Sequence, residues 1–298
     1  MIDDRQVEYF KAFGFLVLRN LFSADEVRTI RSEFDYRAEI ASGYEPYDGT
    51  KVCNMVMMGN DTPFFASLLE DDRFLQIAQK LYGDVTGDVV TADRRMGDTV
   101  WHHDAGGYDE AGVRFAFYPQ PLTAQTGALR LLGGSHLQPW HNQLDEMEPI
   151  GAKWYRHSAT EQEKALANAT IDKIPAYVCE TEPGDVIACD LRTFHASCGG
   201  NTDRHMCSLM YFKYPQTPAE IELTISQAKG WTSEKKRLAD PWNPALLRSC
   251  WEEDLDRHPL RKLWIERMQH FSQMPEGQNG VRAVAVNGKL RIVAVEPS

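Results

Sequence analysis

The sequence predicts a mainly β fold with flanking helices. Between residues 85 and 214, short runs of β-branched and aromatic residues alternate with Gly, Pro, Asn and Asp, which is typical of a sandwich or barrel of short strands. The residues on either side have the apolar spacing of helices. A chain of 298 residues is ample for a buried core. We expect one domain over 1–298, with the strand-rich core at about 85–214, helical support over 1–84, and a helical extension with a hairpin over 215–298.

Helix signals dominate the N-terminal part. Gly14 ends a short amphipathic helix, and the apolar run after it predicts a strand. The run Ser23-Ala24-Asp25-Glu26 forms a capping box before residues with helical apolar spacing. Thr62 followed by Pro63 is a typical helix start, because the first helical residue needs no N–H donor. The elements expected here are a helix over Gln6–Phe13, a strand over Phe15–Leu21, and helices from Ser23 to about Ile40, from about Thr62 to Leu69, and over Arg73–Leu81.

A second helical part follows the strand-rich core. The strands expected in the core are Asp88–Thr91, Thr99–His103, Val113–Tyr118, Ala128–Leu132, Asp185–Asp190 and Ser208–Tyr214, with an interruption at 137–177 that contains the helix-prone segment Glu161–Ala169. After Pro215, the expected helices are Pro218–Ala228, Pro244–Glu252 and Pro259–Phe271. The dipeptide Asn287-Gly288 predicts a hairpin between Val281–Val286 and Lys289–Val295, because both turn positions tolerate positive φ. The tryptophans gathered in this last part indicate that it is packed.

The charge balance disfavours several classes of partner. Acidic residues outnumber basic ones by 43 to 32, a formal net charge of −11, which argues against nucleic acid and against an anionic membrane surface. No apolar run approaches the ~20 residues needed to span a bilayer, and the first residues lack the basic and apolar regions of a signal peptide. The six cysteines form no C-x-x-C pair, so we expect free thiols in a reducing, cytoplasmic compartment.

A His-x-Asp pair in the core gives the first chemical signal. Side chains alternate along a strand, so His102 and Asp104 point to one face and His103 to the other. One imidazole and one carboxylate from one strand are two thirds of the facial triad that binds non-haem Fe(II) and leaves positions open for other ligands. His195 follows a second apolar strand and a short bend, and it is the candidate third ligand. Its separation from Asp104 requires the chain to return through several strands, as in a jelly roll.

Other motifs accompany this pair. Arg204 begins the last apolar strand of the core, where a guanidinium is suited to hold a carboxylate through two parallel hydrogen bonds. The motifs, in chain order, are Trp101-His102-His103-Asp104, Gly127-Ala-Leu-Arg-Leu-Leu-Gly-Gly-Ser-His136, Pro183-Gly-Asp185, and His195-Ala-Ser with Arg204 downstream. In this order they resemble the phytanoyl-CoA dioxygenase family of Fe(II)/2-oxoglutarate-dependent oxygenases. The resemblance covers the N-terminal strand–helix unit and about residues 85–214. It implies a double-stranded β-helix (jelly-roll, cupin-like) core with iron and 2-oxoglutarate in its mouth.

The resemblance also implies a role for each matching residue. His102, Asp104 and His195 are similar to the iron ligands, and Arg204 is similar to the anchor for the far carboxylate of 2-oxoglutarate. The implied reaction consumes 2-oxoglutarate and O2, releases succinate and CO2, and hydroxylates or otherwise oxidises an unactivated C–H bond, with ascorbate as a candidate reductant. The carboxylate of Asp104 argues for oxidation, since related halogenases lack it so that chloride can bind iron. We expect a small-molecule or secondary-metabolite substrate, and a monomer or homodimer.

Several further residues are weaker candidates. Thr126 is a candidate donor to a carboxylate of 2-oxoglutarate, and His103, Arg192 and Met57 are candidate substrate contacts. Each has a structural alternative: packing for His103, a salt bridge for Arg192 and core filling for Met57. Two other functions stay open at this point. One is a cupin-like metalloenzyme that does not use 2-oxoglutarate and would not need Arg204, and the other is a non-catalytic jelly-roll binding protein, against which the intact triad argues.

Overall fold

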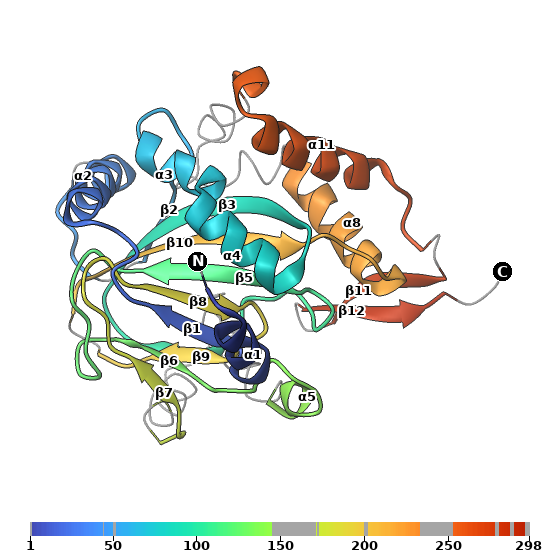
Figure 1. Ribbon diagram of the computed structural model, residues 1–298, viewed down its shortest axis with the longest axis horizontal. Helices are drawn as coiled ribbons and strands as arrows, with labels where there is room; N and C mark the ends of the chain where they lie inside the picture. The colour runs from blue at the N-terminus through green and yellow to red at the C-terminus, as the bar shows by residue number, and fades with distance from the viewer. Residues whose placement is uncertain are drawn as a thin grey trace.

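Two antiparallel sheets face each other at the centre of the molecule, as the alternating strand pattern predicts (Figure 1). This description rests on a computed structural model. The structure describes residues 2–43, 45–49, 52–144, 171, 173–199, 202–232, 253–277, 280–286 and 289–295. The helix-prone segments expected at 161–169 and 244–252 lie outside these residues.

The larger sheet has six strands. Their order across the sheet is β1 (Phe15–Leu18), β8 (Val186–Asp190), β5 (Gly112–Phe117), β10 (Arg204–Lys213), β3 (Val85–Arg95) and β2 (Cys53–Val56). Both edge strands come from the N-terminal part, because β1 pairs with β8 and β2 pairs with β3. The sheet therefore extends beyond the core predicted at about 85–214, and residues 1–84 supply strands as well as helices. The strand β2 was not predicted.

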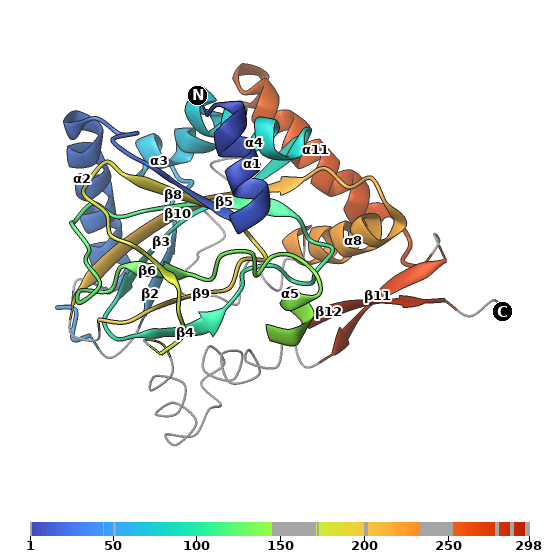
Figure 2. The ribbon, with the colours of Figure 1, turned by 60° about the horizontal axis from the view of Figure 1, so that its bottom comes forward.

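The smaller sheet has four strands and lies opposite the larger one (Figure 2). Its order is β4 (Thr99–His102), β9 (His195–Ser197), β6 (Leu129–Leu131) and β7 (Tyr177–Cys179). The pairing of β4 with β9 places His102 directly opposite His195. Two residues far apart in the sequence thus become cross-strand neighbours.

Helices cover the outer face of the larger sheet (Figure 1). They are α1 (Asp4–Phe13), α2 (Ala24–Ala41), α3 (Pro63–Ser67), the 3-10 turn η1 (Leu68–Glu70) and α4 (Asp72–Tyr82), close to the predicted bounds. Alternation along β5 sorts its residues between two environments. Val113, Phe115 and Phe117 pack into the apolar core beneath the helices, while Arg114 and Ala116 face the space between the sheets.

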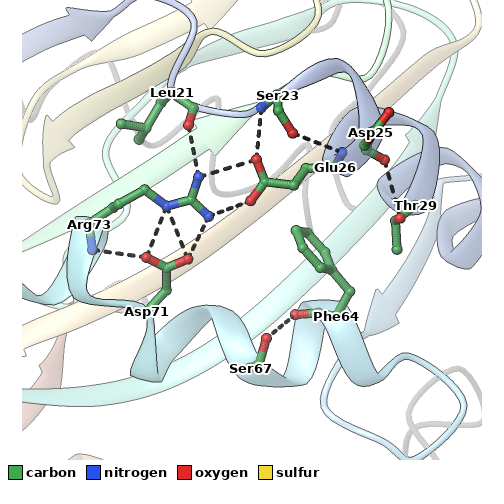
Figure 3. A network of polar contacts seen from close by, with 9 residues as sticks. All are labelled: Leu21, Ser23, Asp25, Glu26, Thr29, Phe64, Ser67, Asp71 and Arg73. Atoms are coloured by element: carbon green, nitrogen blue, oxygen red, sulfur yellow. Dashed lines mark hydrogen bonds and ion pairs between the residues drawn. The ribbon is translucent and has the colours of Figure 1, made fainter.

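One arginine joins two of these helices at their N-termini (Figure 3). Ser23 and Glu26 form the predicted capping box of α2, and Asp71 caps α4. The guanidinium of Arg73 donates to Glu26 Oε1 at 2.7 Å, to Asp71 Oδ2 at 2.6 Å and to the carbonyl of Leu21 at 2.9 Å. The contact fixes both helices against the chain that leaves β1.

The C-terminal part packs against the same outer face. Its elements are α8 (Pro218–Thr232), the short turn η3 (Leu255–Arg257), α11 (Pro259–Gln273) and the predicted hairpin β11 (Val281–Val286) with β12 (Lys289–Ala294). Trp264 of α11 is buried in the main core and lies edge-on to Tyr211, with ring centroids 6.1 Å apart. A short helix, α5 (Trp140–Leu144), precedes the residues not described. None of the described helices has the length and apolar character needed to cross a bilayer.

Candidate metal centre and co-substrate pocket

A cavity of about 660 Å³ opens between the two sheets. Both sheets contribute to its wall, because each strand turns every second side chain towards the space between them. Its charged and histidine wall residues among those described are His102, His103, Asp104, His195, Asp93, Arg95, Arg114 and Arg204. The chemistry predicted from the sequence is therefore concentrated in one place.

The predicted metal ligands converge on one point of this cavity. Candidate ligand atoms of His102, Asp104 and His195 all lie within 4.8 Å of one another. Nε2 of His102 is 3.8 Å from Asp104 Oδ1, and Nε2 of His195 is 3.7 Å from Asp104 Oδ2. The other nitrogen of each ring, Nδ1, lies within hydrogen-bond distance of a backbone carbonyl, that of Val100 at 2.8 Å and that of Thr193 at 2.9 Å. These carbonyls orient each ring so that Nε2 faces the carboxylate.

Burial sets the protonation state of the two imidazoles. It lowers the pKa of His102 to about 3, helped by the neighbouring His195, and it also lowers the pKa of His195. Both rings are therefore neutral near pH 7, which is the form that binds metal ions. Two neutral imidazoles and one carboxylate in a compact group match the donor set that Fe(II) oxygenases use. The residues present thus fit an Fe(II) ion.

Asp104 has a partner that the sequence did not reveal. Nη1 of Arg114, on strand β5 of the larger sheet, donates to Asp104 Oδ2 at 2.7 Å. Burial by itself would raise the pKa of Asp104, but the charge and hydrogen bond of Arg114 outweigh it and hold this pKa below its usual range. The carboxylate therefore stays ionised and ready for a metal ion.

Arg204 lies at another wall of the same cavity. Its Nη1 donates to Ser197 Oγ at 2.6 Å and to the carbonyl of Gly127 at 3.2 Å, and its Nη2 donates to the carbonyl of Gly97. These oxygens hold the guanidinium in place at the cavity wall, and a guanidinium is suited to bind a carboxylate there. Ser197, from the matched His-Ala-Ser run, is a positioning partner that sequence reasoning had not singled out.

The weaker candidates divide between the cavity and other places. His103 lines the cavity. Thr126, Met57 and Arg192 are not among the described residues of its wall: Thr126 Oγ1 accepts from the Thr123 N–H at 2.8 Å within its own turn, and Met57 is fully buried in the apolar core.

Arg192 forms a salt bridge in place of a cavity contact. Its Nη2 lies 2.6 Å from Asp190 Oδ2, the residue two positions earlier. The hydroxyl of Tyr82 donates to the same oxygen at 2.6 Å. The structural alternatives given for Met57 and Arg192 are thus the arrangements present in the structure.

Comparison with known proteins agrees with this site. The family model for phytanoyl-CoA dioxygenase (PhyH) matches residues 10–206. Ectoine dioxygenase of Stutzerimonas stutzeri (strain A1501) is 28% identical over 235 residues, which are 69% of this chain and 74% of that protein.

Solved structures share the fold. HygX from Streptomyces hygroscopicus, with nickel and 2-oxoglutarate bound, matches with a TM-score of 0.54 and 18% identity over 73% of this chain and 89% of its own. EctD from S. alaskensis, with 2-oxoglutarate and 5-hydroxyectoine, matches with a TM-score of 0.51 and 21% identity over 71% of this chain and 76% of its own. The predicted jelly-roll core is confirmed. Since the family model spans most of the chain, the protein belongs to the phytanoyl-CoA dioxygenase (PhyH) family and is an Fe(II)/2-oxoglutarate-dependent dioxygenase.

Proposed function

We propose that His102, Asp104 and His195 bind Fe(II), and that Arg204 binds the far carboxylate of 2-oxoglutarate. The observation that carries the proposal is the approach of both imidazole Nε2 atoms to one carboxylate, 3.8 and 3.7 Å away. The backbone carbonyls at Nδ1 favour the tautomer whose Nε2 lone pair points to the metal position. The reaction that follows is hydroxylation, or a related oxidation, of an unactivated C–H bond in a small molecule.

The side chains of the cavity prepare this reaction. Fe(II) bound with 2-oxoglutarate and O2 supplies the oxidant, with succinate and CO2 as co-products. Asp104 places a negative charge beside the ion, and Arg114 keeps that carboxylate in one orientation. Arg204, held by Ser197, fixes the direction in which 2-oxoglutarate lies. The burial of His102, His195 and Arg204 strengthens their electrostatic contacts.

The size of the cavity supports a small-molecule substrate. Its volume of about 660 Å³ lies within the range of roughly 300–1,000 Å³ common for such sites. The similarity to an ectoine dioxygenase supports the same class, and ectoine is a suitable first compound for a substrate screen. His103 lines the cavity, and we propose it as a substrate contact.

The test is anaerobic addition of Fe(II) and then 2-oxoglutarate to metal-stripped protein. We expect a metal-to-ligand charge-transfer band in the visible spectrum, and succinate once air is admitted. The His102→Ala variant should lose the band, and the Arg204→Met variant should need much more 2-oxoglutarate to produce it. His270→Ala serves as the control, because this histidine lies exposed on α11.

Either of two results would refute the assignment. If folded, iron-loaded protein gives no band at saturating 2-oxoglutarate, these residues do not form a 2-oxoglutarate site. If His102→Ala retains the band with wild-type affinity for iron, the metal ligands have been assigned wrongly. Thermal unfolding of each variant separates loss of binding from loss of fold.

A further inference from the structure

A second carboxylate, Asp93, opens into the cavity and has no part in the chemistry described above. Alternation along β3 turns Asp93 and Arg95 towards the space between the sheets. The register places Asp93 opposite Met206 of β10 on one side and Asn54 of β2 on the other. All four of these residues line the cavity.

The carboxylate of Asp93 is unusual because the protein gives it few stabilising contacts. Within the described part of the chain, no hydrogen bond or ion pair reaches its oxygens. The nearby guanidinium groups are directed elsewhere: Arg114 donates to Asp104 at 2.7 Å, and Arg95 donates to Thr99 Oγ1 at 2.7 Å. A partly buried carboxylate that lines a cavity without a hydrogen bond from the protein costs stability, so such a group is expected where a ligand completes it.

The direction of the pKa shift of Asp93 agrees with an unfavourable environment for its charge. Burial raises the pKa of Asp93, and the attraction of Arg95 and Arg114 does not fully offset it. The ionised form is therefore less favourable in the folded protein than in the unfolded chain. A cation bound at Asp93 would remove this cost, whereas an anion would add to it.

We propose that Asp93 binds a protonated nitrogen of the substrate: an ammonium, amidinium or guanidinium group. The inference rests on the proposed function only in taking the occupant of this cavity to be the substrate. The neighbours of Asp93 suit a donor-rich cation, since the amide oxygen of Asn54 and the thioether of Met206 are both acceptors. Among the described residues, Asp93 belongs to no cluster of three or more metal-ligating side chains, which favours an organic cation.

The position of Asp93 also fixes where the substrate is oxidised. The sulfur of Met206 is 3.7 Å from Nη2 of Arg114, whose Nη1 contacts Asp104. A single side chain therefore separates the proposed cation subsite from the residues around the metal centre. The C–H bond that reacts should lie within a few bonds of the protonated nitrogen.

Isosteric probes that differ in charge test the proposal. Acetamidinium and acetamide have nearly the same shape, and guanidinium and urea form a second such pair. Each is titrated at millimolar concentration into 15N-labelled full-length protein loaded with Zn(II) and 2-oxoglutarate, and the dissociation constant is taken from the chemical-shift changes. We expect each cation to bind about tenfold or more tightly than its neutral partner, because a charge-assisted hydrogen bond is the stronger one.

Two variants make the test specific. Asp93→Asn keeps the shape of the side chain and removes its charge, so the preference for the cation should disappear. Asp84→Asn is the matched control, since Asp84 lies exposed just before the same strand and pairs with Arg267. Equal binding of the charged and neutral probes by the wild-type protein would overturn the proposal. A preference that survives in Asp93→Asn would overturn it as well.

Stability distinguishes a ligand-binding carboxylate from a structural one. If Asp93 is kept for a ligand, Asp93→Asn should unfold at the same temperature as the wild-type protein or at a higher one. A clear fall in the unfolding temperature would assign Asp93 to the fold and refute the inference. These readouts need no turnover, so they stand apart from the iron and 2-oxoglutarate titration that tests the proposed function.

Discussion

At the scale of single residues, the state of Asp104 depends on a neighbour from another strand. Arg114 donates to Asp104 Oδ2 at 2.7 Å, so it both orients the carboxylate and keeps it ionised. We predict that Arg114→Met weakens Ni(II) binding about 10- to 100-fold, the usual cost of removing a partner of a metal ligand. Arg114→Lys should recover part of this loss, because it restores the charge without the planar donor pair. Calorimetric titration of metal-free protein measures both effects.

Arg130→Met is the control for this prediction. Arg130 alternates away from the cavity on β6, where Leu129 lines the wall and Arg130 Nη2 donates to the carbonyl of Ala124 at 3.3 Å. Its loss should leave metal affinity unchanged. If Arg114→Met bound Ni(II) as tightly as Arg130→Met, Arg114 would have no positioning role.

A glycine beside Arg204 gives a second prediction at this scale. Gly127 has φ +99°, and a Cβ there would lie 2.5 Å from Cδ of Arg204. We predict that Gly127→Ala displaces the guanidinium and raises the Kd for 2-oxoglutarate about 10- to 100-fold, with little change in metal affinity. Gly134→Ala is the control, since it has a similar φ of +79° and its Cβ would meet only the carbonyl of Ala12 at 3.6 Å. Equal losses in the two variants would point to backbone strain and away from Arg204.

Sequence patterns predicted some of these residues and not others, for a physical reason. His102 and Asp104 were predicted from alternation along one strand, but the strand ends at His102, so Asp104 lies in the bend after it and His103 lines the same cavity. His195 and Arg204 follow from motifs in chain order. Arg114 gains its importance from the facing sheet and Asp93 from the strands paired beside it, and no local pattern marks such contacts.

Two residues proposed from the sequence as substrate contacts, Arg192 and Met57, lie away from the described cavity wall. Arg192 lies beside a motif, but the carboxylate two residues before it, Asp190, is close enough to form a salt bridge. Met57 belongs to a methionine-rich run that is suited to a cavity wall and to a core alike, and burial in the core is where the structure places it. Proximity to a motif in sequence is therefore a poor guide to proximity in space.

At the scale of elements, Arg73 links two helix N-termini through Glu26 and Asp71 (Figure 3). These side chains are partly exposed, so we predict that Arg73→Met lowers the free energy of unfolding by about 1 kcal/mol. The hydrogen bond from Arg73 lowers the pKa of Glu26 below its ordinary 4.5. The deficit should therefore be full above that pH and shrink as the pH falls further and Glu26 takes up a proton.

Urea unfolding at several pH values measures this deficit. Arg28→Met is the control, because Arg28 pairs with Asp25 on the exposed side of α2, and such pairs contribute little. A deficit in Arg73→Met that did not change with pH would mean that Glu26 contributes nothing to the contact.

Helices and strands with clear local sequence signals were predicted, and those without such signals were missed. A capping box with apolar spacing marked α2, the pair Thr62-Pro63 marked the start of α3, and Asn287-Gly288 marked the C-terminal hairpin. The strand β2 (Cys53–Val56) has only four residues, and one of them, Asn54, is of a type that strands disfavour. It becomes a strand by pairing with the edge of β3, which is a tertiary contact.

At the scale of the whole molecule, the site requires parts of the chain that are distant in sequence. The proposed metal centre joins β4 to β9 in the smaller sheet, and Arg114 reaches it from the larger sheet. The two sheets must therefore keep their separation, and the helices on the outer face support the larger one. Trp264 of α11 belongs to this support, since a Cβ at Gly87 of β3 would lie 2.7 Å from its ring.

This packing predicts how the C-terminal part unfolds. Trp264 is almost completely buried in the main core, so Trp264→Ala should lower the free energy of unfolding by about 3–5 kcal/mol. If residues 1–298 fold as one domain, the variant should show a single transition at lower urea concentration, followed equally by circular dichroism and by tryptophan fluorescence. Leu263→Ala on the exposed side of the same helix should change little, since Leu263 is 40% exposed. The contrary result would be two separate transitions, of which Trp264→Ala shifts one and leaves the other unchanged. It would show that the C-terminal extension unfolds as a unit of its own and that the single-domain prediction is wrong.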